Sequence, residues 1–175
     1  GLKDAGITGC IKHFPGHGDT KADTHYGYAE SLKTWEEISS CEMIPFRKGV
    51  ASGARMVMTA HICLPNVLGA SIPCTMSPVI LQDHLRDELG FKGIIITDSM
   101  GMGAVTQEYG PDVAAVTALL AGADVILDPA DYPLAFESVV DAVTSGRIPM
   151  ALIDEKVDRV LNLKKSILTA RGQLK

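Results

Sequence analysis

Titratable side chains follow short apolar runs at several places in this 175-residue chain. The polar ends of the four runs read Lys12-His13, Thr59-Ala60-His61, Thr97-Asp98 and Leu127-Asp128. A buried apolar strand has no packing reason to end in a lysine, a histidine or an aspartate. A carboxylate at such a position can act as a nucleophile, and an imidazole can exchange a proton near neutral pH. The titratable residues at these strand ends are therefore the first candidates for catalysis.

The loop after the first run carries further groups of this kind across residues 12–25. One proline and two glycines interrupt it: Pro15, Gly16 and Gly18. These residues exclude a helix, so His13 and His17 are not a helical zinc pair. The glycines permit sharp turns and a close approach of the backbone to a ligand. The segment is therefore predicted to be a binding loop.

A carboxylate and an imidazole lie two positions apart further along the same loop, at Asp23 and His25. On a loop, Asp23 can accept a hydrogen bond from one ring nitrogen of His25. The other ring nitrogen is then left facing a substrate, and the ring titrates near neutral pH. The spacing therefore predicts a pair that handles protons.

The apolar runs are predicted to be parallel strands at 9–13, 56–59, 93–97 and 124–127. They are apolar almost throughout and do not alternate, which is typical of strands buried on both faces. A last helix is predicted to begin near Asp154. The other predicted helices run from the capping box Thr34-x-x-Glu37 to Gly53, from Ser77-Pro78 to Gly90, from Pro111 to Gly122, and from Pro133 to Gly146.

Repeated strand–helix units build both (β/α)8 barrels and open α/β sheets. A barrel of ~250 residues averages ~31 residues per unit, which matches the shorter intervals between the runs. The fold class is therefore predicted to be α/β, with about four units and a C-terminal helix forming half of a TIM (β/α)8 barrel. A complete four-stranded flavodoxin-like sheet is the alternative. In both folds, sites are built where the strands end.

Several segments resemble the sequence signatures of one family. Lys12–Gly18, followed by Asp23-x-His25, closely resembles the signature of glycoside hydrolase family 3, and more narrowly of its β-N-acetylglucosaminidase (β-N-acetylhexosaminidase) branch. Further segments fit the same family: the nucleophile segment Ile96–Met102, the last barrel strand Ala121–Leu127 and the closing helix Ile153–Leu161. The resemblance implies that residues 1–175 are the C-terminal half of a catalytic barrel whose N-terminal half is absent.

The resemblance also implies roles for individual residues. Asp98 would be the nucleophile of a retaining glycosidase, forming a glycosyl–enzyme ester with the anomeric carbon. His25 would protonate the leaving oxygen and then deprotonate water, with Asp23 orienting its ring. The remaining implied positions contact the sugar or line its pocket: Lys12, His13, His61 and Met100.

The implied substrate is a terminal β-linked N-acetylglucosamine or a related β-hexoside, as in cell-wall recycling, and no cofactor or metal is implied. The net charge of −5 and the lack of a Lys/Arg cluster argue against a nucleic-acid partner or an anionic membrane. The four cysteines lack C-x-x-C spacing, so we interpret them as free thiols in a reducing cytoplasm. The first residue is glycine, which fits a fragment of a longer protein.

Other interpretations stay open. The residue types at His13, His17, Asp23 and His25 also suit zinc, so a metal-dependent barrel hydrolase is a rival. The chain alone is expected to hydrolyse poorly, because the resemblance implies that further sugar contacts, an acidic residue and an arginine, come from the missing half. Half a barrel also exposes two sheet edges, through which copies could self-associate. Within the family, transfer of the sugar to phosphate in place of water is a third alternative.

Overall fold

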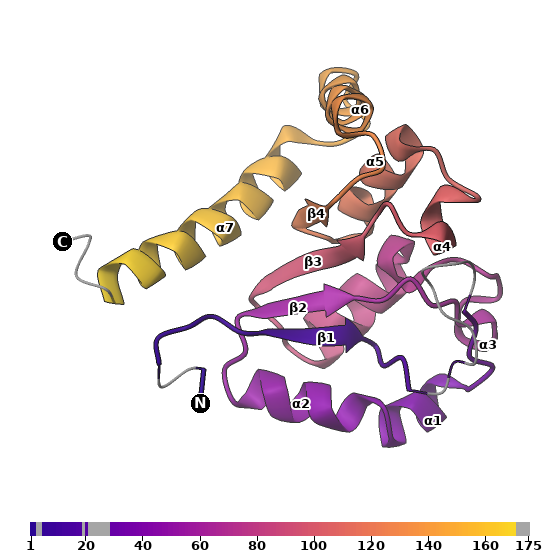
Figure 1. Ribbon diagram of the computed structural model, residues 1–175, viewed down its shortest axis with the longest axis vertical. Helices are drawn as coiled ribbons and strands as arrows, with labels where there is room; N and C mark the ends of the chain where they lie inside the picture. Colours follow the sequence, from indigo (N-terminus) through magenta and orange to yellow (C-terminus); the bar gives the residue numbers. More distant parts are fainter. Residues whose placement is uncertain (3–4, 19, 21–28, 171–175) are drawn as a thin grey trace.

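The computed structural model describes residues 1–2, 5–18, 20 and 29–170. The strands of this part form one parallel sheet: β1 (Cys10–Phe14), β2 (Met56–Thr59), β3 (Ile94–Ser99) and β4 (Val125–Leu127). Their order in space is β1-β2-β3-β4, the same as in the chain (Figure 1). A flavodoxin-like sheet would place the first strand between the second and third. The sequential order therefore agrees with the predicted half-barrel and not with its alternative.

The two inner strands are more deeply buried than the first strand. In the register of the sheet, Ile11 lies beside Val57, and Val57 lies beside Ile95. Val57 and Ile95 are fully buried, whereas Cys10 and Lys12 of β1 are exposed. The prediction of strands buried on both faces is therefore confirmed best for β3. In β2, buried Val57 and Thr59 alternate with half-buried Met56 and Met58, and β4 is half-buried throughout. The prediction is wrong for β1, which has a neighbour on only one side in the described part of the chain.

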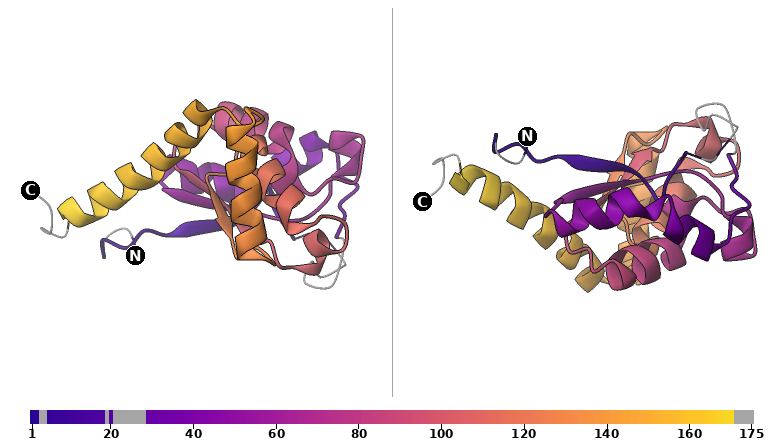
Figure 2. Two further views of the ribbon diagram at one scale, coloured as in Figure 1. Left: turned by 90° about the horizontal axis from the view of Figure 1, so that it is seen from above. Right: turned by 90° about the horizontal axis from the view of Figure 1, so that it is seen from below.

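Helices follow each strand (Figures 1 and 2). Figure 2 shows the last helix running away from the sheet, with its C-terminal end near the N-terminus of the chain. The helices are α1 (Trp35–Ser40), α2 (Met43–Ala51), α3 (Pro65–Leu68), the 3₁₀ turn η1 (Cys74–Met76), the π-helix η2 (Val79–Glu88), α4 (Gly103–Thr106), α5 (Pro111–Ala121), α6 (Tyr132–Thr144) and α7 (Met150–Ala170).

The helix predicted from Thr34 to Gly53 begins as expected but is divided in two. The capping box is present, because the Thr34 side chain accepts from the Glu37 backbone amide and the Glu37 carboxylate accepts from the Thr34 amide. The chain then breaks between α1 and α2. Pro45 explains the break, since its ring would clash with the Cys41 carbonyl in a continuous helix and it has no N–H to donate.

Two later helices begin earlier than predicted. Helix α6 begins at Tyr132, because the Asp131 carboxylate caps it by accepting a 3.0 Å hydrogen bond from the Leu134 amide. Helix α7 begins at Met150, four residues before the predicted Asp154, directly after Pro149. Proline has a backbone angle suited to the start of a helix.

None of the described helices is long and apolar enough to cross a membrane.

A buried ionic cluster ties the amino ends of β3 and β4 to the helices. Asp124, just before β4, has a fully buried side chain that accepts from Arg86 of η2 at 2.6 Å and from Arg159 of α7 at 2.7 Å. Its carboxylate also accepts from the Ile95 amide at 2.8 Å. Lys156 donates to the Ala123 carbonyl, and desolvation lowers its pKa to about 8. The cluster therefore anchors α7 at the edge of the sheet where the strands begin.

Candidate active site

The carboxyl ends of the four parallel strands bring the predicted polar residues to one edge of the sheet. His13 lies within β1 and Asp98 within β3, each next to the last residue of its strand. His61 follows β2 by two residues, and Asp128 directly follows β4. This is the edge at which barrel enzymes carry their chemistry.

His13 and Asp98 meet at this edge although 85 residues separate them in the chain. The Nε2 atom of His13 lies 3.3 Å from Oδ2 of Asp98. The other oxygen, Oδ1, accepts a 2.9 Å hydrogen bond from the Ser99 amide. The two side chains remain 29% and 21% exposed, so the carboxylate is held on both oxygens and still accessible to a ligand.

His61 is buried, unlike His13 and Asp98. Its side chain is 1% exposed, and its Nε2 donates to the Ser99 carbonyl across 3.0 Å. Desolvation lowers the pKa of His61 below its ordinary value of 6.5, outweighing the nearby Asp98 carboxylate and the backbone bond to Ser99. The ring is therefore neutral at pH 7 and acts on the backbone next to Asp98.

Ser99 connects the ends of three strands, and the sequence analysis did not single it out. In addition to the bonds to Asp98 and His61, its hydroxyl donates to the Asp128 carboxylate at 2.7 Å. Asp128 has a positive φ of 47°, an uncommon backbone conformation for a residue other than glycine. Asp128 therefore fixes the loop after β3. The signal that could have identified Ser99 was its place directly after the predicted nucleophile.

Two residues predicted to bind the sugar lie in different settings. Lys12 is exposed on β1. Met100 is only 2% exposed and belongs to the main hydrophobic core, and its amide donates to the Leu127 carbonyl. This burial disfavours the predicted contact of Met100 with the sugar, which stays a prediction.

The predicted proton-handling pair, Asp23 and His25, lies outside the described residues. His17 is described, and its Nδ1 lies 2.6 Å from the Thr20 hydroxyl. The described residues contain no group of three or more His, Cys, Asp and Glu side chains that could hold a metal ion. The proposed zinc set includes Asp23 and His25, so it is not tested by that observation.

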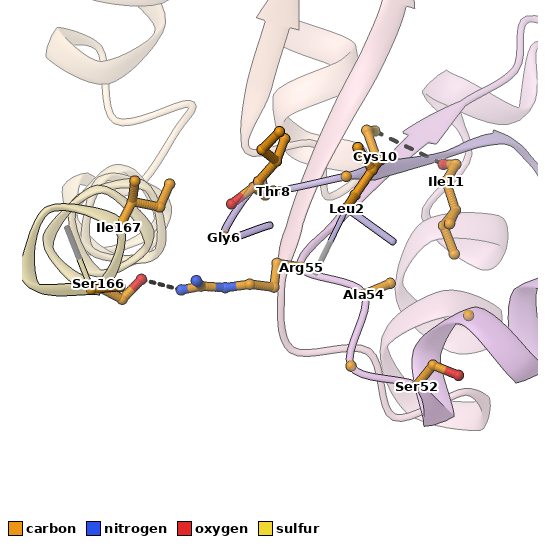
Figure 3. A pocket seen from close by; sticks show the side chains of 15 residues that line it. Leu2, Gly6, Thr8, Cys10, Ile11, Ser52, Ala54, Arg55, Ser166 and Ile167 are labelled. Atoms are coloured by element: carbon orange, nitrogen blue, oxygen red, sulfur yellow. Dashed lines mark hydrogen bonds between the residues drawn. The ribbon is translucent and has the colours of Figure 1, made fainter. Parts of the chain in front are cut away.

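A cavity of about 480 Å³ lies beside the carboxyl end of β1, lined by Lys12, His13 and the glycine loop on one side and by the start of α2 on the other. His13 lines this cavity and also contacts Asp98, so it joins the loop to the strand-end carboxylate. A second cavity of about 460 Å³ lies at the opposite, amino ends of β1 and β2 (Figure 3). Arg55 and Ser166 are hydrogen-bonded across that second cavity, far from the strand ends that carry the candidate catalytic groups.

Comparison with known proteins identifies relatives of the chain. A beta-hexosaminidase of Hydrogenovibrio crunogenus is 41% identical over 152 residues, covering 86% of this chain and 42% of that protein. A glycoside hydrolase family 3 beta-N-acetylglucosaminidase from Paenibacillus sp. str. FPU-7 superposes with a TM-score of 0.91 at 40% identity, covering 95% and 32% of the two chains. Zn-bound CbsA from Thermotoga neapolitana superposes with a TM-score of 0.86 at 31% identity, covering 92% and 36%.

The chain thus spans less than half the length of each of these relatives. The family model described as "Glycosyl hydrolase family 3 N terminal domain" matches residues 1–163. The match includes the glycine loop, the strand-end residues and Asp98, which are the segments on which the family resemblance was based. The chain belongs to glycosyl hydrolase family 3, and its sheet is part of that family's TIM-barrel-like domain.

Proposed function

We propose that this chain is part of a retaining glycosidase that removes terminal β-linked N-acetylglucosamine or a related β-hexoside. Asp98 is the nucleophile, and His25, oriented by Asp23, is the acid and base. The observation that carries the proposal is the setting of Asp98. It is an accessible carboxylate at the carboxyl end of β3, held by the Ser99 amide at 2.9 Å and 3.3 Å from His13.

In the first step, one Asp98 oxygen attacks the anomeric carbon as the glycosidic bond breaks, and His25 gives a proton to the leaving oxygen. In the second step, His25 takes a proton from water, which attacks the anomeric carbon and releases Asp98. An imidazole suits both steps because its pKa lies near neutrality. The roles proposed for Asp23 and His25 are supported by the loop motif and by the family resemblance.

Lys12 and His13 are proposed to bind sugar hydroxyls next to the scissile bond. His13 lies so close to Asp98 that a sugar hydrogen-bonded to the His13 imidazole would lie over the Asp98 carboxylate. Hydroxyl contacts that strengthen in the transition state raise turnover as well as affinity. The N-acetyl preference is supported by the relatives named beta-hexosaminidase and beta-N-acetylglucosaminidase.

The test is turnover of an aryl 2-acetamido-β-glycoside and of the matching plain β-glucoside by the intact protein. We expect the N-acetylated substrate to have the higher kcat/KM, and Asp98→Asn to lower kcat by at least ~10³-fold, as loss of a nucleophile does. Equal turnover of the two substrates would remove the N-acetyl assignment. Undiminished turnover by Asp98→Asn would remove the glycosidase mechanism as a whole. Running the same assay with and without phosphate, and identifying the product, distinguishes hydrolysis from transfer to phosphate.

Zinc is the remaining alternative chemistry, and one structural relative is described as Zn bound. If the proposed mechanism holds, dialysis against a chelator leaves kcat within ~2-fold of its starting value, because no step needs a Lewis acid. Loss of activity on chelation, restored by added zinc, would favour the metal-dependent hydrolase. Metal analysis of the purified protein provides the control.

A further inference from the structure

His61 occupies a fixed position between the first and third strands. The neighbouring Ala60 amide donates to the Phe14 carbonyl at 2.8 Å, which extends the pairing of β2 with β1. On the other side, the His61 ring reaches the Ser99 carbonyl of β3. His61 is 1% exposed, so the backbone before it is fixed to β1 and its ring is enclosed in the protein interior beside β3.

Two hydrogen bonds in series connect the His61 ring to the carboxylate of Asp98. The ring Nε2 donates to the Ser99 carbonyl at 3.0 Å, and the Ser99 amide donates to Oδ1 of Asp98 at 2.9 Å. The bond from His61 restrains the backbone of Ser99, and the Ser99 amide in turn holds the Asp98 carboxylate. Displacement of the Ser99 backbone would therefore turn the Asp98 carboxylate.

The arrangement requires one protonation state of His61. A carbonyl oxygen only accepts, so Nε2 must carry the proton. The ring's Nδ1 is buried without a hydrogen-bond partner, so in the described structure the ring makes its polar contact through Nε2 alone. A buried acceptor without a partner costs free energy, and burial lowers the pKa of the ring, which keeps it neutral. A leucine in this place would leave no buried acceptor without a partner, but it could not hydrogen-bond to the Ser99 carbonyl.

We propose that His61 is a positioning residue whose neutral Nε2–H fixes the Ser99 backbone and thereby orients the carboxylate of Asp98. This inference rests on the proposed nucleophilic role of Asp98. It replaces the expectation that His61 contacts the sugar directly, because a side chain with 1% exposure offers almost no surface to a ligand. His61 therefore acts on turnover through Ser99 and not on substrate binding.

The test compares two substitutions of His61 in the intact protein. In His61→Gln, the amide nitrogen can take the place of Nε2 and donate to Ser99. In His61→Leu, a side chain of similar size has no donor. The matched control is Thr59→Val on the same strand, which removes the buried 2.7 Å contact between the Thr59 and Thr75 hydroxyls without touching Ser99. All three variants and Asp98→Asn are assayed for kcat, KM and thermal unfolding.

A misplacement of about 1 Å at a reacting group can lower the rate ~100-fold, so we expect a fall of that order in kcat for His61→Leu with KM within ~3-fold. His61→Gln should recover at least ~10-fold of that loss because it restores the donor. Thr59→Val should unfold at a lower temperature than the wild type and keep kcat within ~2-fold. The hydrogen bond that it removes, between the Thr59 and Thr75 hydroxyls, contributes to stability and not to the position of Asp98.

Three results would overturn the proposal: unchanged kcat in His61→Leu, equal losses in the Gln and Leu variants, or a loss confined to KM. The last of these would return His61 to substrate binding. Asp98→Asn distinguishes failure of this inference from failure of the proposed function. If Asp98→Asn is inactive while His61→Leu is fully active, only the positioning role fails; if Asp98→Asn is active, the nucleophile itself is misassigned.

Discussion

A carboxylate that attacks a sugar must be open to the ligand and fixed in direction at the same time. Asp98 meets both conditions through its neighbours. The Ser99 amide holds one oxygen, the His13 ring lies near the other, and about a fifth of the side chain stays exposed. An aspartate that only capped a loop would need the amide contact but not the approach of a histidine from another strand. The contact between His13 and Asp98 therefore favours the catalytic interpretation.

At the residue scale, the acid role of His25 predicts a dependence on the leaving group. His25→Ala should lower the rate of bond cleavage ~10²-fold or more for glycosides of poorly acidic alcohols, since general acid catalysis contributes about that much. Nitrophenyl glycosides should lose far less, because their leaving group departs without a proton. The measurement is kcat/KM across a series of aryl and alkyl glycosides. A uniform loss across the series would remove the acid role from His25.

The pKa of His61 predicts an effect of acid on stability. Burial holds this pKa below 6.5 in the folded protein, so between pH 6.5 and the lower folded value the unfolded chain binds more protons. The contribution of His61 to the free energy of unfolding therefore falls as the pH drops below 6.5. His61→Gln should weaken this dependence, measured as the midpoint of urea unfolding at pH 7.5 and at pH values below 6.5. An identical pH dependence in wild type and variant would contradict the assignment of a neutral buried ring.

Residue types at strand ends were enough to predict where the candidate site lies. They identified His13 and Asp98 because parallel strands must bring their carboxyl ends to one edge. They did not show that His61 turns into the protein or that Met100 joins the core. Those outcomes depend on the path of the loop after β3, which the Met100 amide fixes by bonding to the Leu127 carbonyl. Such a contact between distant segments leaves no local pattern in the sequence.

At the scale of elements, the cluster around Asp124 determines how α7 is attached. Arg86 of η2 and Arg159 of α7 bind the two oxygens of one buried carboxylate. The three residues come from segments more than 30 positions apart, so nothing in their spacing predicted the contact. The capping box at Thr34 was predicted because it involves neighbours within one turn. The break before Pro45 was predictable from the same rules, since proline within a helix displaces the carbonyl four residues earlier.

Asp124→Asn should lower the free energy of unfolding by about 3 kcal/mol, because it leaves the Arg86 and Arg159 charges without their buried counter-ion. The matched control is Glu155→Gln, which removes a contact to the same Arg159 from a side chain that is 58% exposed. An exposed pair of this kind contributes at most about 1 kcal/mol. Urea unfolding of both variants measures the difference. Equal losses in the two would show that the buried cluster is not the anchor of α7.

At the scale of the molecule, the two outer strands determine how the 175-residue chain behaves by itself. Strands β1 and β4 each have one neighbour in the described part of the sheet, and unpaired strand edges readily pair with other chains. We predict that this chain, produced alone, self-associates, and that light scattering gives a mass above the 18.6 kDa of one copy. A stable monomer at all concentrations would contradict this prediction.

The proposed mechanism requires Asp98 to form a covalent bond to the sugar. The most direct measurement is mass spectrometry of the intact protein after incubation with an activated β-glycoside whose glycosyl ester hydrolyses slowly. We expect one added glycosyl group, located after digestion on the peptide that contains Asp98 and absent from Asp98→Asn. A glycosyl group on a different residue, or steady turnover without any labelled peptide, would contradict it.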